Sequence, residues 1–283
     1  MKKILSIQSH VAFGYVGNRA AVFPLQRLGH DVIAINTVQF SNHTGYGDWT
    51  GEVFSAEHIG KIIDGLGKRG VLREIDGLLT GYMGDSALGQ TILNVRELIP
   101  RSATWLCDPV MGDVGRGFFV RDGIPDFFKR RAVPKANIIT PNQFELEYLA
   151  GCRIETLDDA RNACREMHEA GPEIILLTSL IHNETKPNEI QMLASAKGGD
   201  QYIVTTPRLP LEPAPNGAGD CTAALFLAHN LAGETLESAL SKTASSIFGL
   251  FEETQKAGTR ELAMIQAQDV FAKPQPMKVE RLS

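Results

Sequence analysis

The sequence predicts an α/β protein in which a mostly parallel, doubly wound central sheet is flanked by helices. Short apolar runs alternate with amphipathic helix patterns along most of the 283 residues, which is typical of strand–helix–strand units with right-handed crossovers. Polar and glycine-rich stretches repeatedly follow the apolar runs, at the positions where open α/β sheets bind ligands. No repeat or linker interrupts the pattern, so we expect residues 1–283 to form a single domain.

The strands of this sheet are predicted from six apolar runs: 4–8, 31–38, 76–82, 104–107, 137–140 and 173–178. Helix patterns lie between them at 20–28, 57–66, 86–98, 145–149 and 157–170. Gly29 and Pro100 stand where the first and third of these helices should stop. Alternating residues on either side of Gly198 and Gly199 predict an antiparallel pair at 190–194 and 202–204. Two final helices are expected at 220–231 and 236–256.

The stretch from Gln39 to Trp49 does not fit the strand–helix alternation. It is polar, glycine-punctuated and aromatic, and it also contains His43 and Thr44. Taken alone, such a stretch is more often a surface loop. Its length and composition also suit a small flap or hairpin near residues 39–50 that folds over a flat ligand with polar edges.

Composition and charge exclude several functional classes. The net charge is −5, and the one basic cluster, Lys129–Arg131, is expected to be a solvated helix end, so we predict no nucleic-acid partner. The four cysteines are far apart, which indicates reduced thiols of a cytoplasmic protein and not a cysteine metal site. The apolar runs are too short for a signal peptide or a membrane span, so we expect no membrane partner.

A glycine-rich turn, Asn216–Asp220, precedes the predicted helix 220–231. Glycines allow a sharp turn and a close approach to a ligand. The first amides of a helix have no intrahelical partner and bind anions. A neighbouring carboxylate, here Asp220, can take a proton from an attacking hydroxyl. The turn therefore suits phosphoryl transfer, although by itself it is equally consistent with an ordinary loop.

Carboxylates also follow two of the other predicted strands. Asp108 and Asp113 come directly after the strand 104–107, and their position favours a metal-associated role over a simple turn. Asn142 and Glu145 share one face at a helix start after the strand 137–140. They suit water-mediated contact with a magnesium–nucleotide, or a capping box, and the two interpretations are compatible.

These motifs, in this order, resemble those of pyridoxal kinases, a branch of the ribokinase-like superfamily. The matching segments are SIQSHV (6–11), GYVGN (14–18), VQFSNHTGY (38–46), TGY (80–82), CDPV (107–110), IITPNQFE (138–145) and GAGD (217–220). The segment 38–46 is the most specific of them, whereas GAGD indicates only the superfamily. The resemblance covers residues 4 to about 230.

The resemblance implies a cytoplasmic homodimer that transfers the γ-phosphate of ATP to the 5′-hydroxyl of pyridoxal in vitamin B6 salvage. Asp220 would be the base, and the anion hole would be formed by Gly217, Ala218 and Gly219. Substrate contacts would come from Ser9, Val16, Val38, Phe40, Thr44, Gly45, Tyr82 and Asp220. ATP contacts would come from Asp108, Asp113, Thr140, Asn142, Glu145, Thr178, Ser179, Pro207, Arg208 and Leu209. Asp108 and Glu145 would hold Mg²⁺ through water, and a requirement for a monovalent cation stays open.

The sequence departs from the family at a few positions. The segment after Asp113 is short, Phe119 stands where some members have Tyr, and Ala218 stands where some have Thr. Residues 207–216 match weakly, so the adenine contacts assigned there rest on position alone. Two alternatives remain: a kinase of pyridoxine, pyridoxamine or hydroxymethylpyrimidine, and a non-catalytic carrier of pyridoxal phosphate. The base and metal carboxylates together argue against the carrier.

Overall fold

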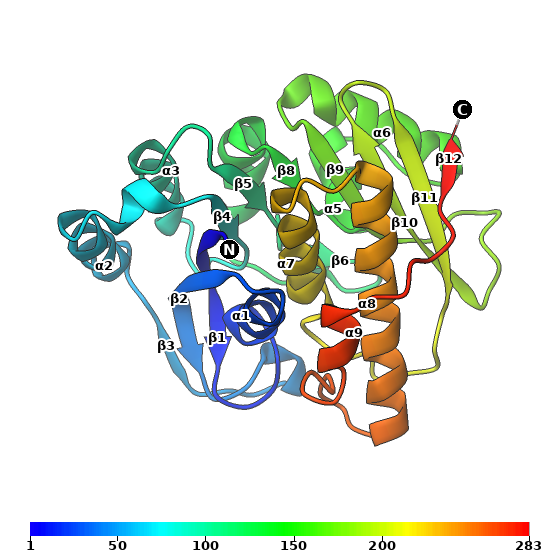
Figure 1. Cartoon of the computed structure of the whole chain (residues 1–283), viewed down its shortest axis with the longest axis horizontal. Helices are drawn as coiled ribbons and strands as arrows, with labels where there is room; N and C mark the ends of the chain where they lie inside the picture. Colours follow the sequence, from blue (N-terminus) through cyan, green and yellow to red (C-terminus); the bar gives the residue numbers. More distant parts are fainter. Residues whose placement is uncertain (283) are drawn as a thin grey trace.

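The computed structural model describes residues 1–282, and its centre is a ten-stranded sheet (Figure 1). The strand order is β12-β11-β10-β9-β8-β5-β4-β1-β2-β3. The six strands from β9 to β2 are parallel: β1 (Lys3–Val11), β2 (Asp31–Phe40), β4 (Gly77–Thr80), β5 (Thr104–Cys107), β8 (Ile138–Ile139) and β9 (Ile174–Leu180). The antiparallel edges are β3 (Gly51–Val53), β10 (Glu189–Ala196), β11 (Gln201–Pro207) and β12 (Glu280–Leu282). The predicted α/β sheet is confirmed.

Helices cover both faces of the sheet because successive strand residues point to opposite sides. Leu5 and Ile7 of β1 belong to one apolar core, and Ile4 belongs to the other. The first core is completed by α2 (Ala56–Lys68), α3 (Leu88–Leu98), α5 (Gln143–Ala150) and α6 (Leu157–Ala170). The second is completed by α1 (Asn18–Arg27), α7 (Ala218–Leu231) and α8 (Leu236–Ala257). This is the doubly wound arrangement.

Helix α7 is buried on nearly all sides. It packs against α1, α8 and the strands β4 and β5, and every residue from Cys221 to His229 is buried. Alanines at 223, 224 and 228 allow this close packing. A helix that is apolar all round is typical of such a position. The start of α7 is therefore held rigidly at the carboxyl edge of the sheet.

The order of the strands reverses next to β1. The chain steps from β1 to β2 on one side, and β4, β5, β8 and β9 then follow on the other side. In open α/β sheets the crevice at such a switch point, at the carboxyl ends of the strands, binds ligands. The topology places any site between the ends of β1 and β4 and their neighbours.

Several elements differ from the sequence-based expectations. The strand predicted at 137–140 shortens to β8, and the helix predicted from 86 begins at Leu88. The less regular tail expected after α8 contains the short helix α9 (Gln268–Ala272) and the edge strand β12, neither of which was predicted. A short hairpin of β6 (Gly112–Asp113) and β7 (Gly117–Phe118) and a helical stretch from α4 (Ile124–Phe127) to Lys135 were also missed. The two strands and each separate turn of the helical stretch are too short to show a periodic pattern of apolar residues.

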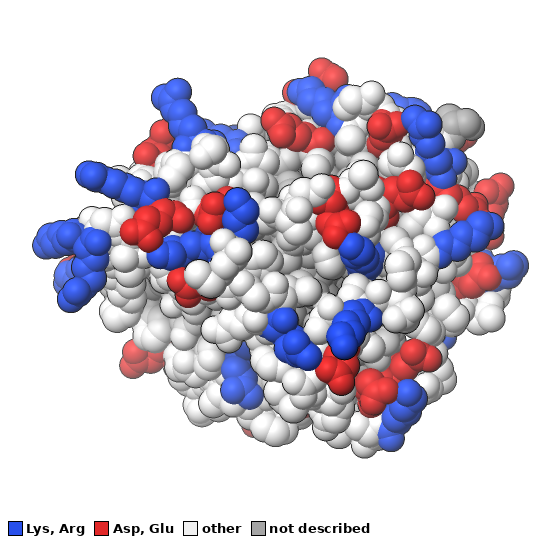
Figure 2. Space-filling model, in the orientation of Figure 1, with Lys and Arg blue, Asp and Glu red and all other residues white. Residues whose placement is uncertain are grey.

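The surface carries charges of both signs in mixture. Figure 2 shows acidic and basic side chains interspersed over the face that carries α1, α7 and α8. Arg130 and Arg131 of the basic cluster are exposed in the helical turn Phe128–Ala132, as expected for a solvated helix end. Among residues 1–282, none of the helices combines the length and the apolar character needed to cross a membrane.

One buried hydrogen bond joins two central strands. The indole Nε1 of Trp105 donates to Thr80 Oγ1 at 2.9 Å, and both side chains are almost fully buried. We expect Thr80→Val to lower the free energy of unfolding by about 1–3 kcal/mol, because the indole N–H would lose its acceptor. Urea denaturation followed by circular dichroism measures this. In a Trp105→Phe background the indole donor is absent, so Thr80→Val should lower the free energy of unfolding clearly less. Equal losses of free energy in the two backgrounds would contradict the prediction.

Candidate active site

A cavity of about 770 Å³ opens at the carboxyl edge of the parallel strands. Its lining includes Ser9 and Val11 at the end of β1, Asp108 after β5, and Thr178 and Ser179 at the end of β9. The volume is in the range of small-molecule sites. The lining also takes in the start of α7 and the loop after β11, so segments from the whole length of the chain meet here.

The turn before α7 forms one wall of the cavity. Gly217 has φ +91°, and a Cβ built there would lie 1.7 Å from the backbone oxygen of Tyr15, so only glycine fits. The first intrahelical bond runs from the Cys221 N–H to the Gly217 oxygen. The amides of residues 218 and 219 therefore have no partner within the helix, and both residues line the cavity at the positive end of the helix dipole. This is an anion-binding arrangement.

Asp220 lies in the first turn of the same helix and lines the cavity. Burial raises the pKa of its carboxyl group to about 6, although the group accepts a hydrogen bond from the Gly17 N–H that acts in the opposite direction. A carboxylate with a pKa close to neutrality is well matched to accept a proton in the physiological range. The chemistry predicted for Asp220 is therefore compatible with its surroundings.

Two further carboxylates lie buried in the cavity wall. Burial, and then the charges of Glu145 and Asp220, raise the pKa of Asp108, whose one described hydrogen bond comes from Thr140 Oγ1 at 3.0 Å. Burial also raises the pKa of Glu145 to about 8, against the effect of backbone amides that donate to it, such as Met111 N at 2.9 Å. Like charges crowded in a dry site favour a bound cation.

The donor set suits a metal that arrives with the nucleotide. Among residues 1–282, no group of three or more His, Cys, Asp or Glu side chains is placed to hold a metal ion. Mg²⁺ needs only one or two protein carboxylates when phosphates and waters complete its shell. Asp108 and Glu145 fit that requirement.

The capping interpretation of Asn142 and Glu145 is confirmed. Asn142 Oδ1 accepts from the Glu145 N–H at 2.9 Å, and Glu145 Oε2 accepts from the Asn142 N–H at 3.0 Å. Asn142 Nδ2 also donates to the Gly112 oxygen at 2.8 Å, which fixes the β6–β7 hairpin beside the cavity. The box thus orients the Glu145 carboxylate while Glu145 still lines the cavity.

The opposite end of the cavity is an apolar slot. Val38 and Phe40 of β2 pack with Val11, and Val16 and Tyr82 lie against this cluster. Strand β3 pairs with β2 and forms the hairpin expected near residues 39–50. Between the two strands, residues 41–50 carry the short helical turn Thr44–Tyr46. We call residues 43–46 the flap, because His43 and Thr44 line the cavity there.

Known proteins resemble this chain over most of its length. The family model described as phosphomethylpyrimidine kinase matches residues 57–264. A "Pyridoxal kinase PdxY" of Rubrobacter xylanophilus is 53% identical over 276 residues, which is 96% of this chain and 94% of the relative. Another "Pyridoxal kinase PdxY", from Deinococcus radiodurans, is 47% identical over 281 residues, covering 96% of this chain and 94% of the relative.

The chain belongs to the pyridoxal kinase family.

Solved structures agree with this assignment. Pyridoxal kinase from Leishmania donovani in complex with ADP and ginkgotoxin superposes with a TM-score of 0.90 at 31% identity, and each chain is covered completely. The complex of the same enzyme with ADP and pyridoxamine gives a TM-score of 0.91 at 30% identity, again with complete coverage of both chains. The ribokinase-like fold expected from the sequence is thus confirmed.

The structure brings together nearly all the residues that the sequence singled out. Twenty of them line the cavity: Ser9, Val16, Val38, Phe40, Thr44, Tyr82, Asp108, Asp113, Thr140, Asn142, Glu145, Thr178, Ser179, Pro207, Arg208, Leu209, Gly217, Ala218, Gly219 and Asp220. Gly45 does not line it. A Cβ at Gly45 would lie 2.9 Å from Asn216 Nδ2 and from His43 Nδ1, so Gly45 of the flap packs against the glycine-rich turn Asn216–Asp220, which we call the phosphate turn.

Some lining residues of this pyridoxal kinase family member were not foreseen. Helix α8 contributes Ala244, Ile247, Phe248 and Phe251 to the cavity. The helix itself was predicted, but its apolar residues looked like ordinary core positions, and only packing shows which of them face a ligand. Asn216 also lines the cavity; it was part of the predicted turn but was given no role.

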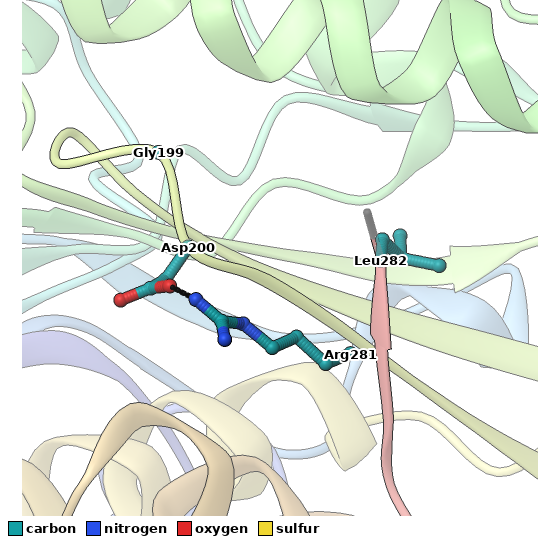
Figure 3. A pocket seen from close by; sticks show the side chains of 4 residues that line it. All are labelled: Gly199, Asp200, Arg281 and Leu282. Carbon is teal, nitrogen blue, oxygen red and sulfur yellow. Dashed lines mark hydrogen bonds and ion pairs between the residues drawn. The ribbon is translucent and has the colours of Figure 1, made fainter.

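A second depression lies at the far edge of the sheet, between the turn that joins β10 to β11 and strand β12. Figure 3 shows Gly199, Asp200, Arg281 and Leu282 around it, and its volume is about 360 Å³. Arg281 Nη2 lies 2.6 Å from Asp200 Oδ1, so the two charged groups beside this depression form an ion pair with each other. It contains none of the catalytic features described above.

The two glycines of the phosphate turn give a matched test of the local geometry. Gly217→Ala should lower the melting temperature by several degrees, because alanine is strained at φ +91° and meets the Tyr15 carbonyl. Gly219 lies inside α7 with nothing within 4 Å of a Cβ, so Gly219→Ala should leave stability unchanged or raise it by about 0.5–1 kcal/mol. Thermal unfolding of both variants is the measurement. Equal melting temperatures would contradict the geometry.

Proposed function

We propose that this chain transfers the γ-phosphoryl group of ATP to the 5′-hydroxyl of pyridoxal and so makes pyridoxal 5′-phosphate, as in vitamin B6 salvage. The observation that carries the proposal is that one cavity contains an anion-binding helix start, the adjacent carboxylate Asp220, and an apolar slot. The names of the relatives and the bound ADP in the Leishmania complexes support the same activity.

The slot accounts for recognition of the vitamer. The aromatic ring of the substrate would lie between the apolar side chains of Val16, Val38, Phe40 and Tyr82, with the polar groups of Ser9 and Thr44 at its edges. This is the usual composition of a small-molecule site: apolar walls with a few polar groups that fix orientation. The substituent that reacts would then point toward Asp220.

The chemistry follows from the start of α7. Asp220 accepts the proton of the 5′-hydroxyl as that oxygen forms its bond to the γ-phosphorus. The bond from this phosphorus to the bridging oxygen of ADP breaks, and the amides of residues 218 and 219 stabilise the charge on the equatorial oxygens. Phosphoryl transfer needs positioning and charge stabilisation above all, and preformed donors supply both.

The nucleotide would occupy the other side of the cavity. We propose that Thr178 and Ser179, and the segment Pro207–Leu209, contact it, together with Asp113, Thr140 and Asn142. Asp108 and Glu145 would hold Mg²⁺ through water. Bound there, the ion would neutralise charge on the phosphates.

Three further expectations belong to the proposal. The continuous sheet from β1 to β12 supports a single domain. The resemblance to homodimeric pyridoxal kinases supports a homodimer, and the dispersed thiols support the cytoplasm. A requirement for a monovalent cation stays open.

An ADP-release assay with four alcohols tests the proposed reaction. Wild-type protein should turn over pyridoxal, and comparison of kcat/KM for pyridoxine, pyridoxamine and hydroxymethylpyrimidine gives its specificity. The last substrate is included because the matching family model is described as phosphomethylpyrimidine kinase. Asp220→Asn should lower kcat by at least about 10²–10³ while ATP binding is kept, because the variant keeps the shape of the site but not the base. Near-normal turnover in Asp220→Asn would remove that residue from its role.

The pH profile tests the same base independently. The pKa of Asp220 is raised to about 6, so the group is ionised only above that pH. We therefore expect ionisation of Asp220 to leave kcat/KM unchanged well above pH 6. Below pH 6, kcat/KM should fall about tenfold per pH unit. The residual activity of Asp220→Asn should lack this acid limb. A wild-type plateau that continues to pH 5, in protein still folded by circular dichroism, would contradict the assignment.

A further inference from the structure

The segment that follows α8 is attached to the flap by several polar contacts. Glu261 Oε1 accepts hydrogen bonds from His43 Nε2 at 2.9 Å and from the Tyr46 hydroxyl at 2.7 Å. Arg260 Nη2 donates to the Gly45 oxygen at 2.6 Å, and its guanidinium carbon lies 3.8 Å from the centre of the Tyr46 ring. We call Arg260 and Glu261 the clamp.

The clamp holds a second loop at the same time. Glu261 Oε2 accepts from the Tyr15 N–H at 3.2 Å, in the loop between β1 and α1. Gly14 leaves room for this contact, because it has φ +91° and a Cβ there would lie 2.3 Å from Glu261 Oε2. One carboxylate thus joins two loops that are more than 25 residues apart in sequence.

This second loop leads directly to the proposed base. The Tyr15 carbonyl occupies the space that a side chain at 217 would need, and the Gly17 N–H donates to the Asp220 carboxylate. The flap also meets the phosphate turn, since Gly45 packs against Asn216 Nδ2. The clamp therefore contacts the Tyr15 loop directly, and it reaches the phosphate turn through Gly45 of the flap.

The Glu261 contact with His43 is sheltered from water, whereas the Arg260 contact with Gly45 is exposed. The Glu261 side chain is 14% exposed and that of His43 is 5% exposed. Hydrogen bonds to a charged group are stronger than those between neutral groups, and donors left unsatisfied in such a place are costly. Removal of the Glu261 carboxylate would leave His43, Tyr46 and the Tyr15 amide without an acceptor, so the flap would lose its attachment.

We propose that Glu261 is a positioning residue for the vitamer, and that together with Arg260 it holds the flap closed over the substrate slot. The inference rests on the proposed kinase function. Neither Arg260 nor Glu261 lines the cavity, so the clamp acts on it through the flap, whose residues His43 and Thr44 do line it. Loss of the clamp should therefore weaken binding of the alcohol and the exclusion of water, and spare binding of ATP.

Steady-state kinetics of Glu261→Ala test this selectivity. We expect KM for pyridoxal to rise at least about tenfold, a loss of the size expected for one charge-assisted contact. KM for ATP should stay within about twofold, and ATP hydrolysis without pyridoxal should increase. Glu261→Gln keeps an acceptor for Tyr46 and His43 and should recover most of the pyridoxal affinity. The matched control is Glu253→Ala, which removes only the surface ion pair to Lys256 at 2.8 Å.

A second measurement is independent of activity. The chain has two tryptophans: Trp49, beside the flap, is 46% exposed, and Trp105 is fully buried. Acrylamide quenching therefore reports on Trp49. Quenching should be stronger in Glu261→Ala than in the wild type, Glu261→Gln or Glu253→Ala.

The outcomes separate the two proposals. Equal changes in KM for pyridoxal and ATP, or unchanged quenching in Glu261→Ala, would overturn the clamp. A wild-type protein that phosphorylates none of the four alcohols would refute the kinase function, while the quenching comparison would still test the attachment of the flap. Rescue by glutamine together with a selective effect on pyridoxal would support the clamp.

Discussion

The close contact between the Tyr15 carbonyl and Gly217 is the constraint on which the site depends. It allows no side chain at 217, and it forces the chain into a left-handed turn before α7 begins. Because α7 is buried among α1, α8 and the sheet, this turn cannot move without disturbing the core. The free amides of the helix start are thus fixed in direction before any ligand binds, which is the preorganisation that electrostatic catalysis requires.

Burial of several carboxylates is the main cost of this arrangement. Asp108, Glu145 and Asp220 all have raised pKa values, and burial is the largest cause in each case. The capping box and the backbone amides near Met111 offset part of the cost at Glu145. The remainder favours ligands that bring positive charge, and within residues 1–282 no group of three or more His, Cys, Asp or Glu side chains could hold a metal ion by itself.

The apolar slot of the cavity and the flap over it are built from segments that are distant in sequence. The apolar wall of the slot belongs to the β-sheet and is rigid, whereas the flap is a short turn between β2 and β3. Such a turn has little packing of its own, so its position depends on contacts made by other segments. The residues after α8 supply those contacts.

The sequence by itself determined the strand–helix order, the phosphate turn and the polar residues at the strand ends, because periodicity, glycine chemistry and motif spacing are local properties. The roles proposed for Asp220, Asp108 and Glu145 rest on those positions in the sequence and on the family resemblance. Only the tertiary structure decided which face of α8 enters the cavity, that Gly45 packs behind its lining, and that Glu261 meets His43, Tyr46 and Tyr15. The Glu261 contacts join residues more than 200 positions apart, and no local pattern records a partner at that distance.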